Sequence, residues 1–175
     1  MKKRVVMVLC AVLLLCSCKS GNKGDITVYP QDLLPSEIVE AYTGYKPNVT
    51  QEFSRRVSKA KYLPEQLGKN DPVILEFYQA NQLMSKEKIE SIFDENKSMR
   101  SDSFDVGNLG AKAYIAYPSI HYYINGYYVK ITAGSKSDDM QKSLLENLAS
   151  ESYEKLKEIT GVKYEEPDDS ESVAE

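Results

Sequence analysis

Cysteine and histidine are scarce in this chain of 175 residues, and tryptophan is absent. The three cysteines all lie within the first eighteen positions, and the one histidine is His121. Zinc sites need clustered His and Cys ligands, and phosphate or dinucleotide sites need characteristic glycine patterns, neither of which this sequence contains. The sequence therefore predicts no metal centre and no cofactor.

The N-terminus has the pattern of a processing segment. A basic stretch, Lys2 to Arg4, precedes an apolar core over residues 5–15. That core is too short to span a bilayer, which takes about 20 apolar residues. The residues that follow, Leu15-Cys16-Ser17-Cys18, resemble a bacterial lipoprotein signal. This resemblance implies that residues 1–17 are removed and that Cys18 carries a thioether diacylglycerol.

Two other interpretations of these cysteines are weaker. Cys16 is a poorer lipid site because Leu15 is too large for the small residue expected before it, and Cys10 lies inside the apolar core. Alternatively, the segment is a short buried helix with chance cysteines. We expect a lipid-anchored, extracytoplasmic protein at the cell membrane or the outer membrane, held by two acyl chains on Cys18.

The mature chain is acidic. Three of the 22 basic residues lie in the predicted signal, so 19 remain against 26 acidic residues. This net charge of about −7 argues against nucleic acid or anionic lipid headgroups as partners. Residues 19–25 are small, polar and glycine-bearing, and we expect residues 18–30 to be the lipidated cysteine and a flexible tether, while residues 165–175 carry six carboxylates and predict a disordered tail. A single domain is expected over residues 31–164.

Helix and strand patterns alternate within that domain. Ser36 is a candidate N-cap and Gly44 a candidate C-cap of a first helix, and Ser85 is a good N-cap for a second. Residues 48–57 predict a strand, and residues 72–79 predict a buried strand with a helix as the alternative. A long helix is expected over residues 137–160, ended by Gly161, with an apolar stripe that includes Met140, followed by a short strand over residues 162–164.

A β-hairpin is the clearest local pattern. Asn125-Gly126 divides two β-rich runs as a two-residue turn does. Pairing outward from this turn sets Tyr122 opposite Val129 and His121 opposite Lys130. Ile120, Tyr122, Ile124, Tyr127, Val129 and Ile131 then share a core face. Residues 111–117 predict a third antiparallel strand, with Pro118 and Ser119 in the turn.

The opposite face of the hairpin is the candidate binding face. It carries His121, Tyr123, Tyr128 and Lys130, and tyrosine offers a flat apolar ring with a polar tip. Two interpretations stay open. In the first, favoured one, the tyrosines lie beneath a helix. In the second they are exposed and form a patch for a glycan, a peptide or a partner protein.

The layout supports a family resemblance. The first helix "DLLPSEIVEAYTG", the "GNLGAKAYI" entry into the hairpin and the long C-terminal helix resemble uncharacterised bacterial lipoproteins of the PsbP-like and LpqN-type α+β fold. The resemblance covers most of residues 31–164. It implies a twisted antiparallel sheet with helices packed on it, and no inherited catalytic residues.

A binding role is the function that these observations favour. A Ser-His-Asp site would have to use His121, in a strand beside tyrosines and without a nucleophile-elbow motif. We therefore expect no enzyme but a binding or scaffolding domain of the cell envelope, whose partners are the membrane, through Cys18, and an envelope protein or glycan. An envelope hydrolase that uses carboxylates and a structural accessory subunit are the alternatives.

Overall fold

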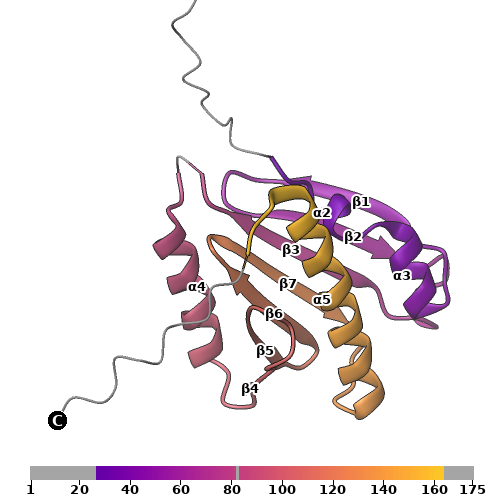
Figure 1. Cartoon of the computed structure of the whole chain (residues 1–175). Helices are drawn as coiled ribbons and strands as arrows, with labels where there is room; N and C mark the ends of the chain where they lie inside the picture. The colour runs from indigo at the N-terminus through magenta and orange to yellow at the C-terminus, as the bar shows by residue number, and fades with distance from the viewer. Residues whose placement is uncertain (1–26, 82, 164–175) are drawn as a thin grey trace, which may run out of the picture.

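Seven antiparallel strands form one open sheet (Figure 1). The structure is a computed structural model that describes residues 27–81 and 83–163. The strands are β1 (Asn48–Phe53), β2 (Ser58–Leu63), β3 (Val73–Gln79), β4 (Phe104–Asp105), β5 (Lys112–Ala116), β6 (Ser119–Ile124) and β7 (Tyr127–Ala133). Their order across the sheet is β1-β2-β3-β7-β6-β5-β4. The predicted α+β class, a single domain with helices packed on an antiparallel sheet, is confirmed.

The predicted hairpin and its register are confirmed. Tyr122 pairs with Val129 and His121 pairs with Lys130. Asn125 and Gly126 have φ angles of 45° and 89°, as a tight two-residue turn requires. β5 adds the predicted third strand, although its turn to β6 holds Tyr117 and Pro118, and Ser119 already belongs to β6.

The first two strands differ from the prediction, whereas β3 is the buried strand that was expected. β1 ends at Phe53 because Ser54 closes a turn, in which its hydroxyl accepts from the Val57 N–H at 3.1 Å. β2 was not predicted. Its lysines alternate with the buried Ala60 and Tyr62, so it is an amphipathic strand whose apolar side consists of few residues.

The helices are α2 (Pro30–Leu33), α3 (Ser36–Thr43), α4 (Lys86–Ser98) and α5 (Asp139–Thr160). The cap at Ser85 is confirmed, since its side chain accepts from the Lys88 N–H. The expected cap at Ser36 is wrong: Pro35 holds the N-cap position and Ser36 is already helical. α5 begins two residues later than predicted, with Asp138 as its cap. Gly44 and Gly161 end α3 and α5 in the left-handed conformation, as predicted.

The helices divide unequally between the two faces of the sheet. α2 and α5 pack on one face together with α3, which contacts α5, and α4 alone packs on the other (Figure 1). The core beneath α5 is mainly aliphatic and includes Leu75, Val129, Ile131, Leu145, Leu148 and Leu156. Met140 does not join it, against the prediction, because 81% of its side chain is exposed in the first turn of α5.

Packing of the domain begins inside the segment predicted as a tether. Val28 is buried, and its N–H donates to Gln79 Oε1 at 3.2 Å. The predicted signal peptide, Cys18 and the acidic tail 165–175 lie outside the described residues. Val162 and Lys163 form no strand, and Tyr164 of that predicted strand is also outside. In the part of the chain that is described, no helix has both the length and the apolar character needed to cross a membrane.

Candidate functional site

The structure places the predicted binding residues under and beside α4. His121, Tyr123 and Tyr128 are 6%, 7% and 1% exposed, while Lys130 is half-buried. These rings therefore lie beneath a helix, as in the first of the two interpretations. They form no exposed patch, because α4 packs across β6 and β7 on this face.

Phe93 is the centre of this α4 cluster. Its ring lies 5.1 Å from Tyr114, 5.9 Å from Tyr123 and 5.5 Å from Tyr128, measured between ring centroids. Such aromatic pairs stabilise a core beyond their buried area by about 0.5–1.5 kcal/mol each. The tyrosines that the sequence pattern singled out therefore serve to attach α4 to the sheet.

His121 is the polar centre of the α4 cluster. Its Nδ1 lies 3.0 Å from the Tyr114 hydroxyl and 2.8 Å from the Tyr128 hydroxyl. The Asn96 side chain donates to the Tyr128 hydroxyl at 3.3 Å, which leaves that hydroxyl's hydrogen for Nδ1. Burial, helped by the charges of Lys130 and Arg100, lowers the pKa of His121 to about 3. The imidazole is neutral at physiological pH and is held by phenols rather than by a carboxylate.

Lys130 belongs to a charge cluster on the sheet just outside α4. The Glu76 carboxylate contacts the Lys59 ammonium and lies 2.9 Å from the Lys130 ammonium. Burial raises the pKa of Glu76, but the hydrogen bonds from both lysines outweigh burial and lower that pKa overall. Glu76 is therefore ionised at neutral pH, and its single negative charge is shared between two lysines.

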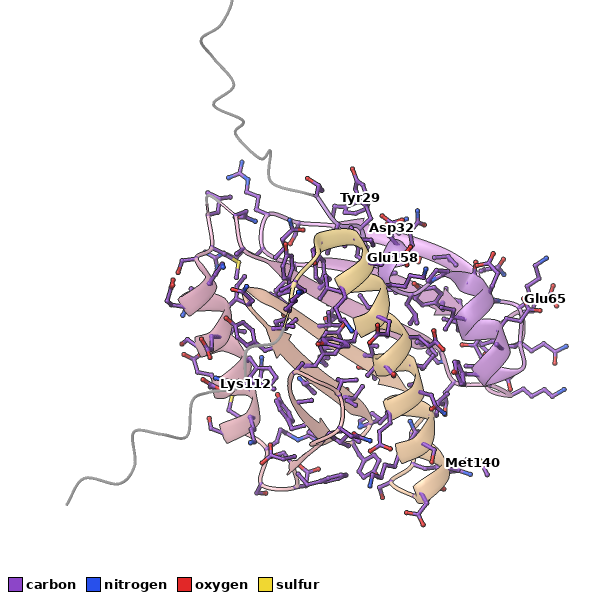
Figure 2. The ribbon with its side chains drawn as sticks, viewed as in Figure 1. Tyr29, Asp32, Glu65, Lys112, Met140 and Glu158 are labelled. Carbon is purple, nitrogen blue, oxygen red and sulfur yellow. The ribbon has the colours of Figure 1, made fainter. Side chains whose placement is uncertain are left out.

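A groove lies on the α5 side, at the end of the domain where α5 begins. It has a volume of about 530 Å³ and runs between the C-terminal end of α3, the loop before β3 and the first turns of α5. We call it the α3–α5 groove. Its lining includes Tyr42, Tyr45, Lys69, Asn70, Asp71, Lys136, Asp138, Met140, Leu144 and Asn147. Figure 2 places Met140 at this end of α5, far from Tyr29 and Glu158 at the other.

Two tyrosines form the α3 side of this groove. The Tyr45 hydroxyl lies 3.2 Å from the Tyr62 backbone oxygen and 3.1 Å from that of Asp71, which share its one hydrogen, and so fixes the loop before β3. The Tyr42 hydroxyl donates to Glu151 on α5 at 3.1 Å, while 40% of Tyr42 stays exposed. Both rings are therefore held at their hydroxyl ends, and Tyr42 keeps apolar surface open to a ligand.

The turn from β7 to α5 forms the base of the groove. Gly134 has a φ angle of 68°, and a Cβ atom built there would lie 1.9 Å from Gln141 Oε1. Gln141 is buried and its side-chain amide donates to the Ala133 backbone oxygen. A side chain at position 134 would displace the Gln141 amide and would be strained at this φ angle, so the turn favours glycine.

The charged side chains of the groove differ in how they are engaged. Asp71 accepts a hydrogen bond from Ser135 at 3.1 Å, and Asp138 caps α5 by accepting from the Gln141 N–H at 2.8 Å. Among the described residues, no ion pair joins Lys69 or Lys136 to an acidic side chain. The groove thus holds two cations and two carboxylates, and its formal charges balance. Both carboxylates accept hydrogen bonds from Ser135 or from the start of α5, whereas the two lysines, the amides and the partly apolar lining stay available to a ligand that carries carboxylates.

Sequence reasoning missed the groove. Its residues come from three separated segments, and each segment alone has the composition of an ordinary loop or helix end. Within the described ranges, no group of three or more His, Cys, Asp and Glu side chains is arranged to hold a metal ion.

Comparison of the chain with protein-family models, with curated proteins and with solved structures finds no match, and the resemblance to PsbP-like and LpqN-type lipoproteins stays a prediction.

Proposed function

We propose that the protein is a lipid-anchored, extracytoplasmic binding domain of the cell envelope, and that the α3–α5 groove holds a carboxylate-bearing peptide segment of an envelope partner. The observation that carries the proposal is the combination in one groove of exposed apolar surface at Tyr42 and Met140 with two cations, Lys69 and Lys136, that form no ion pair with the residues that the structure describes. Its volume of about 530 Å³ lies within the range of about 300–1,000 Å³ usual for ligand sites.

The anchor explains where this groove would work. A lipid on Cys18 holds the domain by its N-terminal end, and the described chain begins beside the C-terminal end of α5 (Figure 1). The 22 residues of α5 span about 33 Å. The groove, at the start of α5, would then face away from the membrane and toward partners within the envelope.

A hydrolytic role is less well supported. The half-buried carboxylate Glu76 is the natural candidate for a general acid, but Lys59 and Lys130 lower its pKa. An acid catalyst needs the opposite shift. A structural accessory role remains an alternative that the binding experiment distinguishes.

The binding proposal is tested by selecting ligands from an unbiased displayed peptide library on the immobilised mature chain. We expect the recovered peptides to be rich in acidic and apolar residues, and Lys69→Glu combined with Lys136→Glu to weaken their binding by at least about tenfold. The matched control is Lys88→Glu combined with Lys163→Glu, which makes the same charge change away from the groove. Peptides without acidic bias, or equal losses in both double variants, would refute the groove as the site, and recovery of no peptide would favour the accessory role.

The anchor is tested separately. Cys18→Ser should block acylation and leave an unprocessed precursor, as read from the intact mass and from labelling with a fatty-acid probe. If the variant still matures and takes up the probe, the lipid site is elsewhere.

A further inference from the structure

One corner of the domain combines exposed apolar side chains with positive charge. We call it the tether corner, and it consists of the N-terminal residues Thr27 to Tyr29, the turn between β1 and β2, and the loop between β3 and α4. Thr27, Arg55, Arg56 and Leu83 line one shared hollow there. Figure 1 shows these three segments along the same edge of the molecule.

The apolar side chains of the tether corner are strongly exposed. Tyr29, Phe53 and Leu83 are 47%, 59% and 67% exposed, and the rings of Tyr29 and Phe53 meet edge to face with centroids 5.7 Å apart. Single exposed apolar residues need no explanation, but a group at one corner is typical of an interaction surface.

The charge of this corner is opposite to that of the chain. The turn carries Arg55 and Arg56, and the adjoining first turn of α4 carries Lys86 and Lys88 with one acidic residue, Glu87, while Glu52 in β1 is paired with Lys61. Within the described part of the chain neither arginine forms an ion pair. The whole-chain charge, which argues against anionic lipid, therefore does not describe this corner. Acidic side chains such as Asp32 and Glu158 lie nearby, toward the end of α5 (Figure 2).

The short stretch between Cys18 and the first described residue, Thr27, indicates that this corner faces the membrane. Nine residues lead from Cys18 to Thr27, and even a fully extended chain of that length reaches only about 30 Å. An acyl group on Cys18 therefore keeps the tether corner near the bilayer surface, while the α3–α5 groove lies at the far end of α5. Apolar residues beside arginines are the composition that binds at a membrane interface.

We propose that the tether corner docks on an anionic membrane surface, with Phe53 and Leu83 among the lipid headgroups and Arg55 and Arg56 at lipid phosphates. This docking rests on the proposed anchor at Cys18 and orients the groove away from the membrane. Arginines at such a surface attract anionic lipid, so loss or reversal of both should weaken binding by more than about tenfold.

The absence of tryptophan makes this docking directly measurable. Phe53→Trp and Leu83→Trp each introduce one fluorophore at the tether corner, and Met140→Trp is the matched control at the groove. The acylated mature protein is placed in vesicles of phosphatidylglycerol and phosphatidylethanolamine that contain brominated lipid. We expect quenching at positions 53 and 83 and none at position 140. Equal quenching at all three positions, or none at 53 and 83, would overturn the docking.

A second arm separates docking from anchoring. The mature chain with Cys18→Ser and Phe53→Trp carries no lipid, and we expect it to bind vesicles rich in phosphatidylglycerol but not vesicles of phosphatidylcholine. Adding Arg55→Glu and Arg56→Glu should reduce this binding more than about tenfold, whereas Lys69→Glu with Lys136→Glu should leave it unchanged. The docking is refuted if the unlipidated chain binds neither kind of vesicle, or if both double variants lose binding equally. If the protein that keeps Cys18 has an intact mass without acyl chains, only the anchor is refuted.

Discussion

The two faces of the sheet are both buried beneath helices, but they are held by different chemistry. Under α5 the contacts are mainly aliphatic, as at Val129, Ile131 and Leu148, and its tyrosine hydroxyls form separate hydrogen bonds, such as that between Tyr122 and Ser152 at 2.9 Å. Under α4 the contacts are aromatic and polar, around Phe93 and His121. The first face depends mainly on apolar area, whereas the second combines aromatic packing with a connected group of hydrogen bonds around His121.

This difference explains why one hairpin could be interpreted in two ways. Alternate residues of β6 and β7 point to opposite faces, and the residues that face α4 are those that a binding surface would also use. A tyrosine with a hydrogen-bonded hydroxyl can be core or interface. Whether a helix covers the tyrosine decides between these two roles. Four predictions test the difference between the two faces.

The largest effect is expected from a charge placed under α5. Val129→Asp puts a carboxylate at a fully buried position without a partner, which should cost more than about 3 kcal/mol of unfolding free energy. The neighbouring Lys130→Ala, on the other face, should cost less than about 1 kcal/mol. Urea unfolding midpoints compare the two. The reverse order would mean that the register is shifted by one residue.

The next effect is a pH dependence that belongs to the α4 face. The pKa of His121 is about 3 in the folded protein and about 6.5 when unfolded, so below pH 6.5 the unfolded state binds a proton that the folded state does not. Stability should therefore fall by about 2–3 kcal/mol between pH 7 and pH 4.5. Urea midpoints at both pH values, compared with those of His121→Gln, isolate this part, because carboxylates titrate in both proteins. Equal pH dependence in the two proteins would contradict it.

A smaller effect compares one hydroxyl on each face. Tyr128→Phe removes a group that contacts both His121 and Asn96, and it should cost about 1–2 kcal/mol because these polar atoms lose a partner. Tyr122→Phe removes a single bond to Ser152 and should cost about 1 kcal/mol or less. Thermal unfolding of both variants gives the comparison. A larger loss for Tyr122→Phe would show that polar contacts matter as much under α5.

The smallest effect is expected at the open end of α5. Met140 is 81% exposed, so Met140→Ala should change the unfolding free energy by less than about 0.5 kcal/mol. Leu145→Ala, one of the buried positions on the same helix, should cost about 2–5 kcal/mol. A cost at Met140 close to that at Leu145 would place Met140 in the core. If Met140→Ala is as stable as the parent chain but binds the selected peptides more weakly, this result supports the α3–α5 groove as the peptide site.

The hairpin could be predicted because its signals are local. The Asn125-Gly126 turn sets the register, and alternation then assigns every side chain to a face. Ser85, Gly44 and Gly161 likewise act within one helical turn. β2 escaped prediction because only Ala60 and Tyr62 form its buried side, and its place in the sheet is set by pairing with β1 and β3.

The candidate site could not be predicted, because it depends on how distant segments meet. Met140 lies in the first turn of α5 and is 81% exposed, which its place in the apolar stripe of the sequence did not indicate. Tyr42 reaches the groove through contact between α3 and α5. None of these residues differs by itself from an ordinary loop or helix residue.

The central claim is that the α3–α5 groove, and not the tyrosine-rich hairpin, is the site of binding. Amide chemical-shift mapping of the mature chain, titrated with the tightest peptide from the unbiased library, tests it directly. We predict that the shifts gather in residues 42–45, 69–73 and 133–147, which line the groove. Shifts gathered instead along β6 and β7, or in the β1–β2 turn, would contradict the account.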